Sequence, residues 1–136
     1  MNSIRLAVLL AIACSVGCAS QQPPLADPDA DGRYSIIGVD GIRLAAKGEF
    51  VGEGQVQLRV DMVITETGDP PRTIASPSVI TAVGEDALVE IQGDGANVVC
   101  SIASRRDGSS VIVTVTAVVG RGNTPIGQPT LRFRLP

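Results

Sequence analysis

QVQLRVDM, residues 55–62, decides the fold class of this chain of 136 residues. Apolar and polar residues alternate strictly in it, and the apolar series continues beyond its end. A period of two places the apolar side chains on one face of a β-strand and the polar ones on the other. The stretch therefore predicts a strand that covers a hydrophobic core with one face and meets water with the other. The apolar positions are Val56, Leu58, Val60, Met62 and Ile64.

Three further segments carry a strand pattern. Residues 131–135 (LRFRL) alternate in the same way, and residues 87–91 (ALVEI) form a short run rich in aliphatic residues. Residues 111–119 are rich in β-branched residues and nearly apolar on both faces. β-Branched side chains fit the pleated surface of a sheet, and a run that is apolar on both faces is typical of a buried strand. We therefore predict that residues 111–119 form a central strand.

Clusters of turn-forming residues separate these segments, and the chain holds 15 Gly and 9 Pro. Gly and Pro favour turns and disfavour long helices, and a helical period is absent outside the first 18 residues. Short strands with turns at this spacing predict an all-β fold, an antiparallel β-sandwich or open barrel of about seven to nine strands. The clusters are residues 52–54, 68–71, 84–86, 93–95, 106–108 and 120–123.

The first 17 residues have the layout of a targeting signal. Arg5 is their only charged residue, and residues 6–13 (LAVLLAIA) form an unbroken apolar run. This run is too short to span a bilayer, which needs about 20 residues, and has the length of the apolar part of a signal peptide. SVGC, residues 15–18, resembles the lipobox of bacterial lipoproteins. The resemblance implies cleavage before Cys18, diacylglycerol on its sulfur, and a fatty acid such as palmitate on the new amino terminus.

This resemblance sets the expected domain organisation and location. Residues 1–17 are then the signal peptide, residues 18–32 a lipid-anchored flexible spacer, and residues 33–136 the β-sandwich domain. Ala19 follows the acylated residue, which in bacteria with two membranes implies passage to the outer membrane, facing the periplasm or the cell surface. Two alternatives stay open. AIAC, residues 11–14, is a rival lipobox that ends at Cys14, and an ordinary cleaved signal peptide with incidental cysteines fits the same layout.

Composition argues against several classes of function. The chain carries 14 acidic and 11 basic residues and only three aromatic ones, which is a poor basis for nucleic-acid binding. It contains no His, so the Ser–His and Cys–His arrangements of nucleophilic enzymes are excluded, and we do not expect an enzyme. Cys100 is the single unmodified cysteine left after cleavage before Cys18 and acylation of its sulfur, and it alternates with Val98 and Ile102. We expect it to be an inert thiol of the core.

One acidic motif, DPDADG at residues 27–32, has the spacing of the first half of a calcium loop. The alternating carboxylates of Asp27, Asp29 and Asp31 can converge on a hard cation, and the glycine permits a sharp turn. The second half departs from the pattern, because Gly38 stands at the twelfth position, where a bidentate Glu is expected. A solvated acidic turn is the alternative interpretation.

A longer resemblance covers residues 56–119. The segments VQLRVDMVITE (residues 56–66), ASPSVIT (75–81), GEDALVEIQG (84–93) and DGSSV (107–111) resemble consecutive strands of the secretin family. Secretins are the outer-membrane gates of type II and type III secretion. The resemblance implies that this chain associates through its strands in an outer-membrane assembly, as a subunit or an accessory.

Three functions are therefore expected from the sequence. The first is a non-catalytic envelope lipoprotein, held in the membrane by its lipid, that presents a small β-sandwich to a protein or an envelope polymer. The second is a structural or accessory subunit of an outer-membrane assembly. The third is an adhesion-type module stabilised by calcium.

The lipobox makes a prediction about Cys18. We expect the mature protein, extracted from membranes, to begin at Cys18 and to carry the mass of two or three acyl chains in mass spectrometry, because that number anchors a protein stably. The Cys18→Ala variant should move from the membrane pellet to the soluble fraction. A variant that still sediments with the lipids would contradict acylation at this residue.

Overall fold

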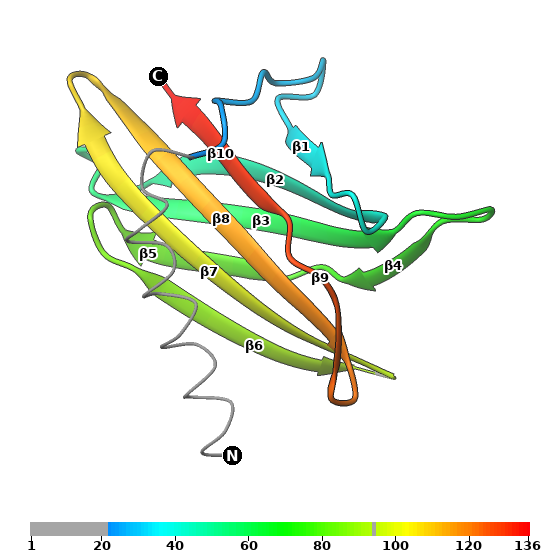
Figure 1. Ribbon diagram of the computed structural model, residues 1–136. Coiled ribbons are helices and arrows are strands. Elements are labelled where there is room, and N and C mark those ends of the chain that lie inside the picture. Colours follow the sequence, from blue (N-terminus) through cyan, green and yellow to red (C-terminus); the bar gives the residue numbers. More distant parts are fainter. Residues whose placement is uncertain (1–21, 94) are drawn as a thin grey trace.

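The computed structural model describes residues 22–93 and 95–136, so Cys18 and the expected signal peptide lie outside the described residues. The described part forms ten β-strands in two antiparallel sheets and contains no helix, which confirms the predicted sandwich (Figure 1). No helix of this part is long and apolar enough to cross a membrane. The strands are β1 (Tyr34–Ile37), β2 (Ile42–Val51), β3 (Gln57–Glu66), β4 (Arg72–Ala75), β5 (Ser78–Ala82), β6 (Ala87–Gly93), β7 (Ala96–Asp107), β8 (Ser110–Arg121), β9 (Thr124–Gly127) and β10 (Thr130–Leu135).

The two sheets follow the same path. Sheet A has the order β1-β2-β3-β4, with β5 also paired to β3, and sheet B has the order β10-β8-β7-β6, with β9 also paired to β8. Each sheet is thus a meander of three strands followed by an edge formed from two short strands. The two halves of the chain repeat one topology, and β8 is central, as its sequence predicts.

The ten strands exceed the expected seven to nine because a proline divides the edge strand of each sheet, Pro77 between β4 and β5 and Pro129 between β9 and β10. Proline has no N–H to give to a ladder, but the register continues across Pro77, since Ile64 pairs with Ala75 of β4 and Asp61 pairs with Ser78 of β5. The neighbouring strand compensates by donating to the proline carbonyl. The Met62 N–H donates to the Pro77 oxygen at 2.8 Å, and the Ala117 N–H donates to the Pro129 oxygen at 3.1 Å. These positions correspond in the two halves.

The core lies between the sheets and is built from the alternating residues of both inner faces. The side chains of Leu58, Val60 and Ile64 are fully buried, as the period of two predicts. Val56 does not follow the prediction, because it precedes β3 and is 55% exposed. Where β1 of sheet A meets β10 of sheet B, the rings of Tyr34 and Phe133 stack with centroids 4.3 Å apart and planes at 13°. Such pairs contribute about 0.5–1.5 kcal/mol beyond their buried area. The Tyr34 hydroxyl donates to the Arg134 carbonyl at 3.0 Å.

A second tie joins the β1–β2 turn to the divided edge of sheet B. The Asp40 carboxylate accepts the N–H of Ile42 at 3.0 Å through Oδ1 and the N–H of Gln128 at 3.3 Å through Oδ2. The chain approaches so closely at Gly127 that a Cβ atom there would lie 2.6 Å from Cγ1 of Ile42. Glycine at this position therefore permits the contact between the two sheets.

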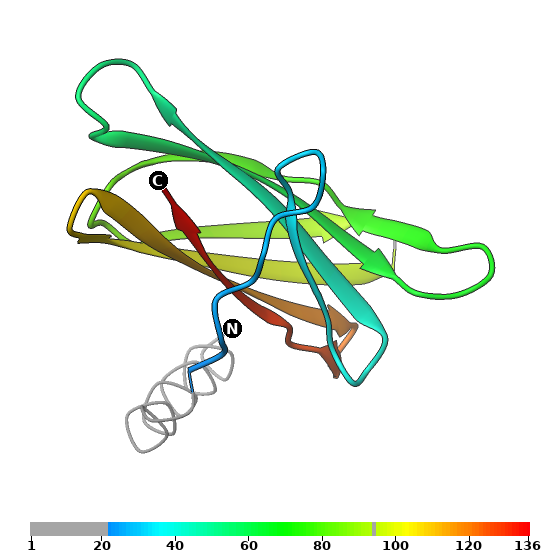
Figure 2. The ribbon, with the colours of Figure 1, turned by 90° about the horizontal axis from the view of Figure 1, so that it is seen from above.

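Part of the expected spacer is attached to the domain. The Ala26 N–H donates to the Arg132 carbonyl at 2.7 Å, and Ala26 packs against the core. This segment occupies part of the outer edge of β10. The described chain begins on the outer side of sheet B, away from sheet A, as both views show (Figure 1 and Figure 2).

Candidate functional site

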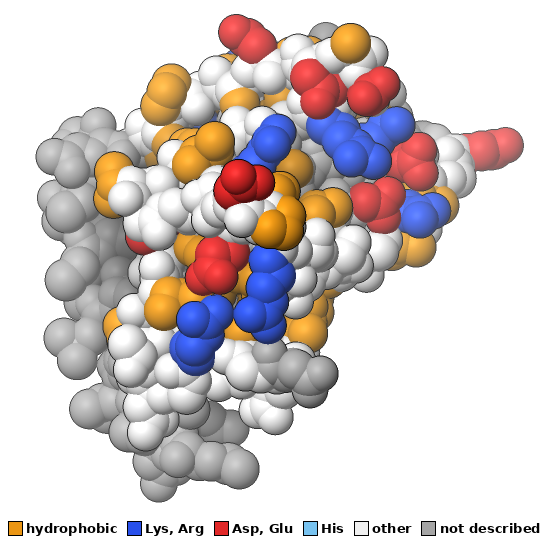
Figure 3. All heavy atoms as spheres, turned by 90° about the vertical axis from the view of Figure 1, so that its right-hand side faces the viewer, with side chains coloured by type: hydrophobic (Ala, Val, Ile, Leu, Met, Phe, Trp, Pro, Cys, Tyr) orange, Lys and Arg blue, Asp and Glu red, His pale blue; other side chains and the backbone are white. Residues whose placement is uncertain are grey.

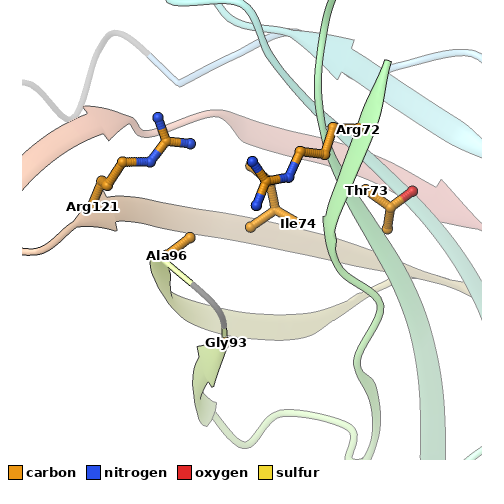
Figure 4. A pocket seen from close by; sticks show the side chains of 6 residues that line it. All are labelled: Arg72, Thr73, Ile74, Gly93, Ala96 and Arg121. Carbon is orange, nitrogen blue, oxygen red and sulfur yellow. The ribbon is translucent and has the colours of Figure 1, made fainter. Parts of the chain in front are cut away.

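An opening lies at one end of the sandwich, where β4 of sheet A approaches the β6–β7 turn and the end of β8. Its volume is about 290 Å³, and we call it the end pocket. Arg72 and Arg121 extend from opposite walls, with Ile74 and Ala96 between them (Figure 4). Figure 3 views this side of the molecule, where basic side chains lie beside acidic and apolar ones. The lining residues are Arg72, Thr73, Ile74, Gly93, Ala96 and Arg121.

Both arginines are positioned by turns. Arg72 is the first residue of β4 after the Pro-rich β3–β4 turn, and Arg121 is the last residue of β8. Gly122 follows in the next turn with a φ of 62°, a left-handed conformation that glycine adopts without strain. The turns were predicted from sequence, but the meeting of these side chains was not. It depends on how sheet A packs on sheet B, for which the local pattern holds no signal.

The end pocket contains two guanidinium groups, those of Arg72 and Arg121, and the carboxylate of Glu66 lies beside them. Nη2 of Arg121 lies 3.5 Å from Oε2 of Glu66, and its Nε donates to the Gly95 carbonyl at 3.3 Å. Glu66 also lies opposite Arg72 in the β3–β4 ladder. A guanidinium is planar and matches carboxylate or phosphate oxygens with paired hydrogen bonds. The pocket is therefore suited chemically to an anionic group with a small apolar part.

A smaller depression of about 210 Å³ lies on the outer face of sheet A beside the acidic motif. Ala45 and Val63 line it together with charged and polar side chains that include Asp29 and Asp31. Asp29 serves the local turn, because its Oδ1 accepts the N–H groups of Asp31 and Arg33, each at 2.9 Å. The hydrogen bond from Arg33 is the main cause that lowers the pKa of Asp29.

The three carboxylates of the calcium motif are not gathered into one site. In residues 22–93 and 95–136, no group of three or more Asp, Glu, His or Cys residues is arranged to hold a metal ion. Asp29 and Asp31 line the depression on sheet A, whereas Asp27 does not. This arrangement gives no support to calcium binding by Asp27, Asp29 and Asp31, which stays a prediction. The observed hydrogen bonds of Asp29 are those of the alternative interpretation, a solvated acidic turn.

Cys100 is a core residue of β7, as expected. Its side chain is fully buried, and burial raises the pKa of the thiol to about 11. The thiol therefore stays protonated at neutral pH, whereas the thiolate is the nucleophilic form.

Comparison with family models, with curated proteins and with solved structures finds no match to this chain. The resemblances to lipoproteins and to secretins therefore rest on the quoted residues alone.

Two substitutions distinguish the interpretation of residues 27–32 as a turn held by Asp29 from their interpretation as a calcium site. We expect Asp29→Ala to lower the melting temperature and Asp31→Ala to leave it unchanged, because only the Asp29 carboxylate accepts the two backbone N–H groups. The folded pKa of Asp29 is lowered, so its contribution is present at neutral pH and is lost as the pH falls through that pKa.

Calcium at millimolar concentration should leave all three melting curves unchanged. A ligand that binds only the folded state must raise the melting temperature. A rise in the wild-type protein that disappears in both variants would therefore establish the calcium site and contradict the turn interpretation.

Proposed function

We propose that this protein is a lipid-anchored envelope module whose sandwich binds an acidic group of a protein or an envelope polymer at the end pocket. The observation that carries the proposal is the pair of arginines on opposite walls of one opening. The lipid on Cys18 holds the module in the outer membrane, and the sandwich presents the pocket to its partner.

The size and chemistry of the pocket support a pendant group as the ligand. A volume of about 290 Å³ is at the lower end of the range for small-molecule sites, which suits one carboxylate or phosphate and a few attached carbon atoms. Ile74 and Ala96 offer apolar contact to those carbons. The side chain of Arg121 is 48% exposed, so the rest of a polymer or protein can continue into solvent.

The pocket is tested by removing one guanidinium at a time. The acylated protein in non-ionic detergent is titrated with inorganic phosphate and with poly-L-glutamate, and amide shifts of Gly93 and Ala96 are followed by NMR. A hydrogen bond to a charged group contributes about 1.5–3 kcal/mol, so we expect Arg72→Gln and Arg121→Gln each to weaken binding about tenfold or more.

Arg59→Gln is the matched control. Arg59 is exposed to 46%, close to the 48% of Arg121, but lies on the outer face of sheet A in ion pairs with Glu49 and Asp61. Binding should be unaffected by this change. The proposal fails if neither probe shifts the pocket amides, or if the control weakens binding as much as the two pocket variants do.

One observation favours the alternative of an assembly subunit. β6 is a seven-residue edge strand that pairs only with β7 within the described residues, and its Leu88 is 63% exposed. An exposed edge can accept a strand of another copy. Glu90 lies at the centre of β6, however, and a charge on an edge opposes such pairing, so the binding function is preferred.

Size-exclusion chromatography of the acylated protein distinguishes the two, since an assembly would elute as rings or a ladder of oligomers.

A further inference from the structure

The outer face of sheet B is formed mainly by hydroxyl and aliphatic side chains. Leu88, Ser101, Thr116 and Thr130 form one row across β6, β7, β8 and β10, and no charge interrupts it. The hydroxyls of Thr116 and Thr130 lie 3.2 Å apart. Val118, in the next row, is 38% exposed, and Leu88 is 63% exposed. Glu90 is exposed in the same row as Val118, at the β6 edge. The face therefore offers exposed apolar groups and hydroxyls, with one carboxylate at its β6 edge.

Basic residues border this area at one end. Arg132 lies opposite Thr114 in the β8–β10 ladder, and Arg134 lies one step further along β10 on the same face, in the row of Arg105. Arg134 forms an ion pair with Asp107 at 2.8 Å. Within the described residues, Arg105 and Arg132 form no ion pair. Their guanidinium groups are suited to the phosphates of lipid headgroups.

The described chain begins at this same end of sheet B. Ala26 donates its N–H to the carbonyl of Arg132, and the described chain starts, at residue 22, on the outer side of the sheet (Figure 2). Cys18 precedes residue 22 by four residues, so even a fully extended chain places it no more than about 14 Å away. An acyl group on Cys18 must enter the bilayer within that distance of the start of the described chain.

The outer face of sheet A also carries basic residues, since Arg43 and Lys47 of β2 lie on it and form no ion pair within the described residues. It differs from the outer face of sheet B in the pairing of its central arginine and in its position. Its central arginine, Arg59, is paired with Asp61 at 3.1 Å and with Glu49 at 3.9 Å, and Asp61 also accepts a hydrogen bond from Ser78. The positive charge of Arg59 is thus offset by two carboxylates. The face also lies on the far side of the sandwich from the start of the described chain, across a sheet spacing of about 10 Å.

From these observations we infer that the outer face of sheet B lies on the lipid surface, with Arg105 and Arg132 at anionic headgroups and sheet A turned to the aqueous side. The inference rests on the proposed acylation of Cys18. Arg121 lies seven residues along β8 from Thr114, the partner of Arg132, which corresponds to roughly 23 Å of strand. The end pocket is thus at the opposite end of the strands from the anchor and stays open to a partner.

The orientation can be measured with single tryptophans, because the chain contains none. Leu88→Trp places the reporter on the outer face of sheet B, and Ile80→Trp places it on the outer face of sheet A. The two residues are matched controls, with exposures of 63% and 59%, and both lie in short strands. The acylated variants are reconstituted in phosphatidylcholine vesicles containing phosphatidylglycerol and lipids with bromine on the acyl chain.

We expect the bromolipids to quench the tryptophan at 88 at least twofold more than the tryptophan at 80. Adding Arg105→Gln and Arg132→Gln to Leu88→Trp should reduce the quenching, as should high salt, because both weaken contacts with anionic headgroups. Melting curves of all variants check that the fold is kept.

Three results would overturn the inference in distinguishable ways. Equal quenching at both positions, or stronger quenching at 80, in protein of confirmed acyl mass would reject the orientation and leave the anchor intact. A blue-shifted emission at 88 that grows with protein concentration in detergent alone would show that a second copy covers the face. A protein without the acyl mass would contradict the proposed function itself.

Discussion

The packing of sheet A on sheet B is the constraint on which the rest of this structure depends. Each sheet is apolar on its inner face, so neither face can be kept from water without the other sheet. The Tyr34–Phe133 stack closes one side of the contact, and the close approach at Gly127 fixes another point of it. The end pocket follows from the same packing, because Arg72 belongs to sheet A and Arg121 to sheet B.

Both sheets limit the pairing of their edge strands with other chains in a similar way. A proline divides the strand that follows each meander, so the edges β4–β5 and β9–β10 are short and interrupted, which hinders the addition of a foreign strand. The outer edge of β10 is partly occupied by the segment around Ala26. This segment joins the domain to the proposed anchor, so in the proposed arrangement the contact that protects the edge also places the outer face of sheet B nearest the lipid.

Residue periodicity predicted the strands, and sequence-distant contacts account for what it could not predict. The alternation in residues 55–64 gives β3, and the apolar run of residues 111–119 gives the central β8. The divisions at Pro77 and Pro129 were not predicted. A proline beside a strand pattern does not show whether the strand ends there or continues on the other side of the proline. Arg72 and Arg121 are 49 residues apart, and nothing local indicates that they share a pocket. The spacing of the Asp residues likewise does not distinguish a carboxylate that binds a metal from one that, like Asp29, accepts its own backbone N–H groups.

The two sheets are stable only together, and the end pocket exists only while they are packed. This interdependence can be measured by amide hydrogen exchange of the acylated protein in detergent, followed residue by residue at increasing denaturant. We expect the slowest amides of β3 and of β8 to converge on one free energy of opening, because a single cooperative unit exposes both sheets at once. If the amides of β7 and β8 stay protected at denaturant concentrations where those of β2 and β3 exchange freely, sheet B is stable alone and the two sheets do not depend on each other.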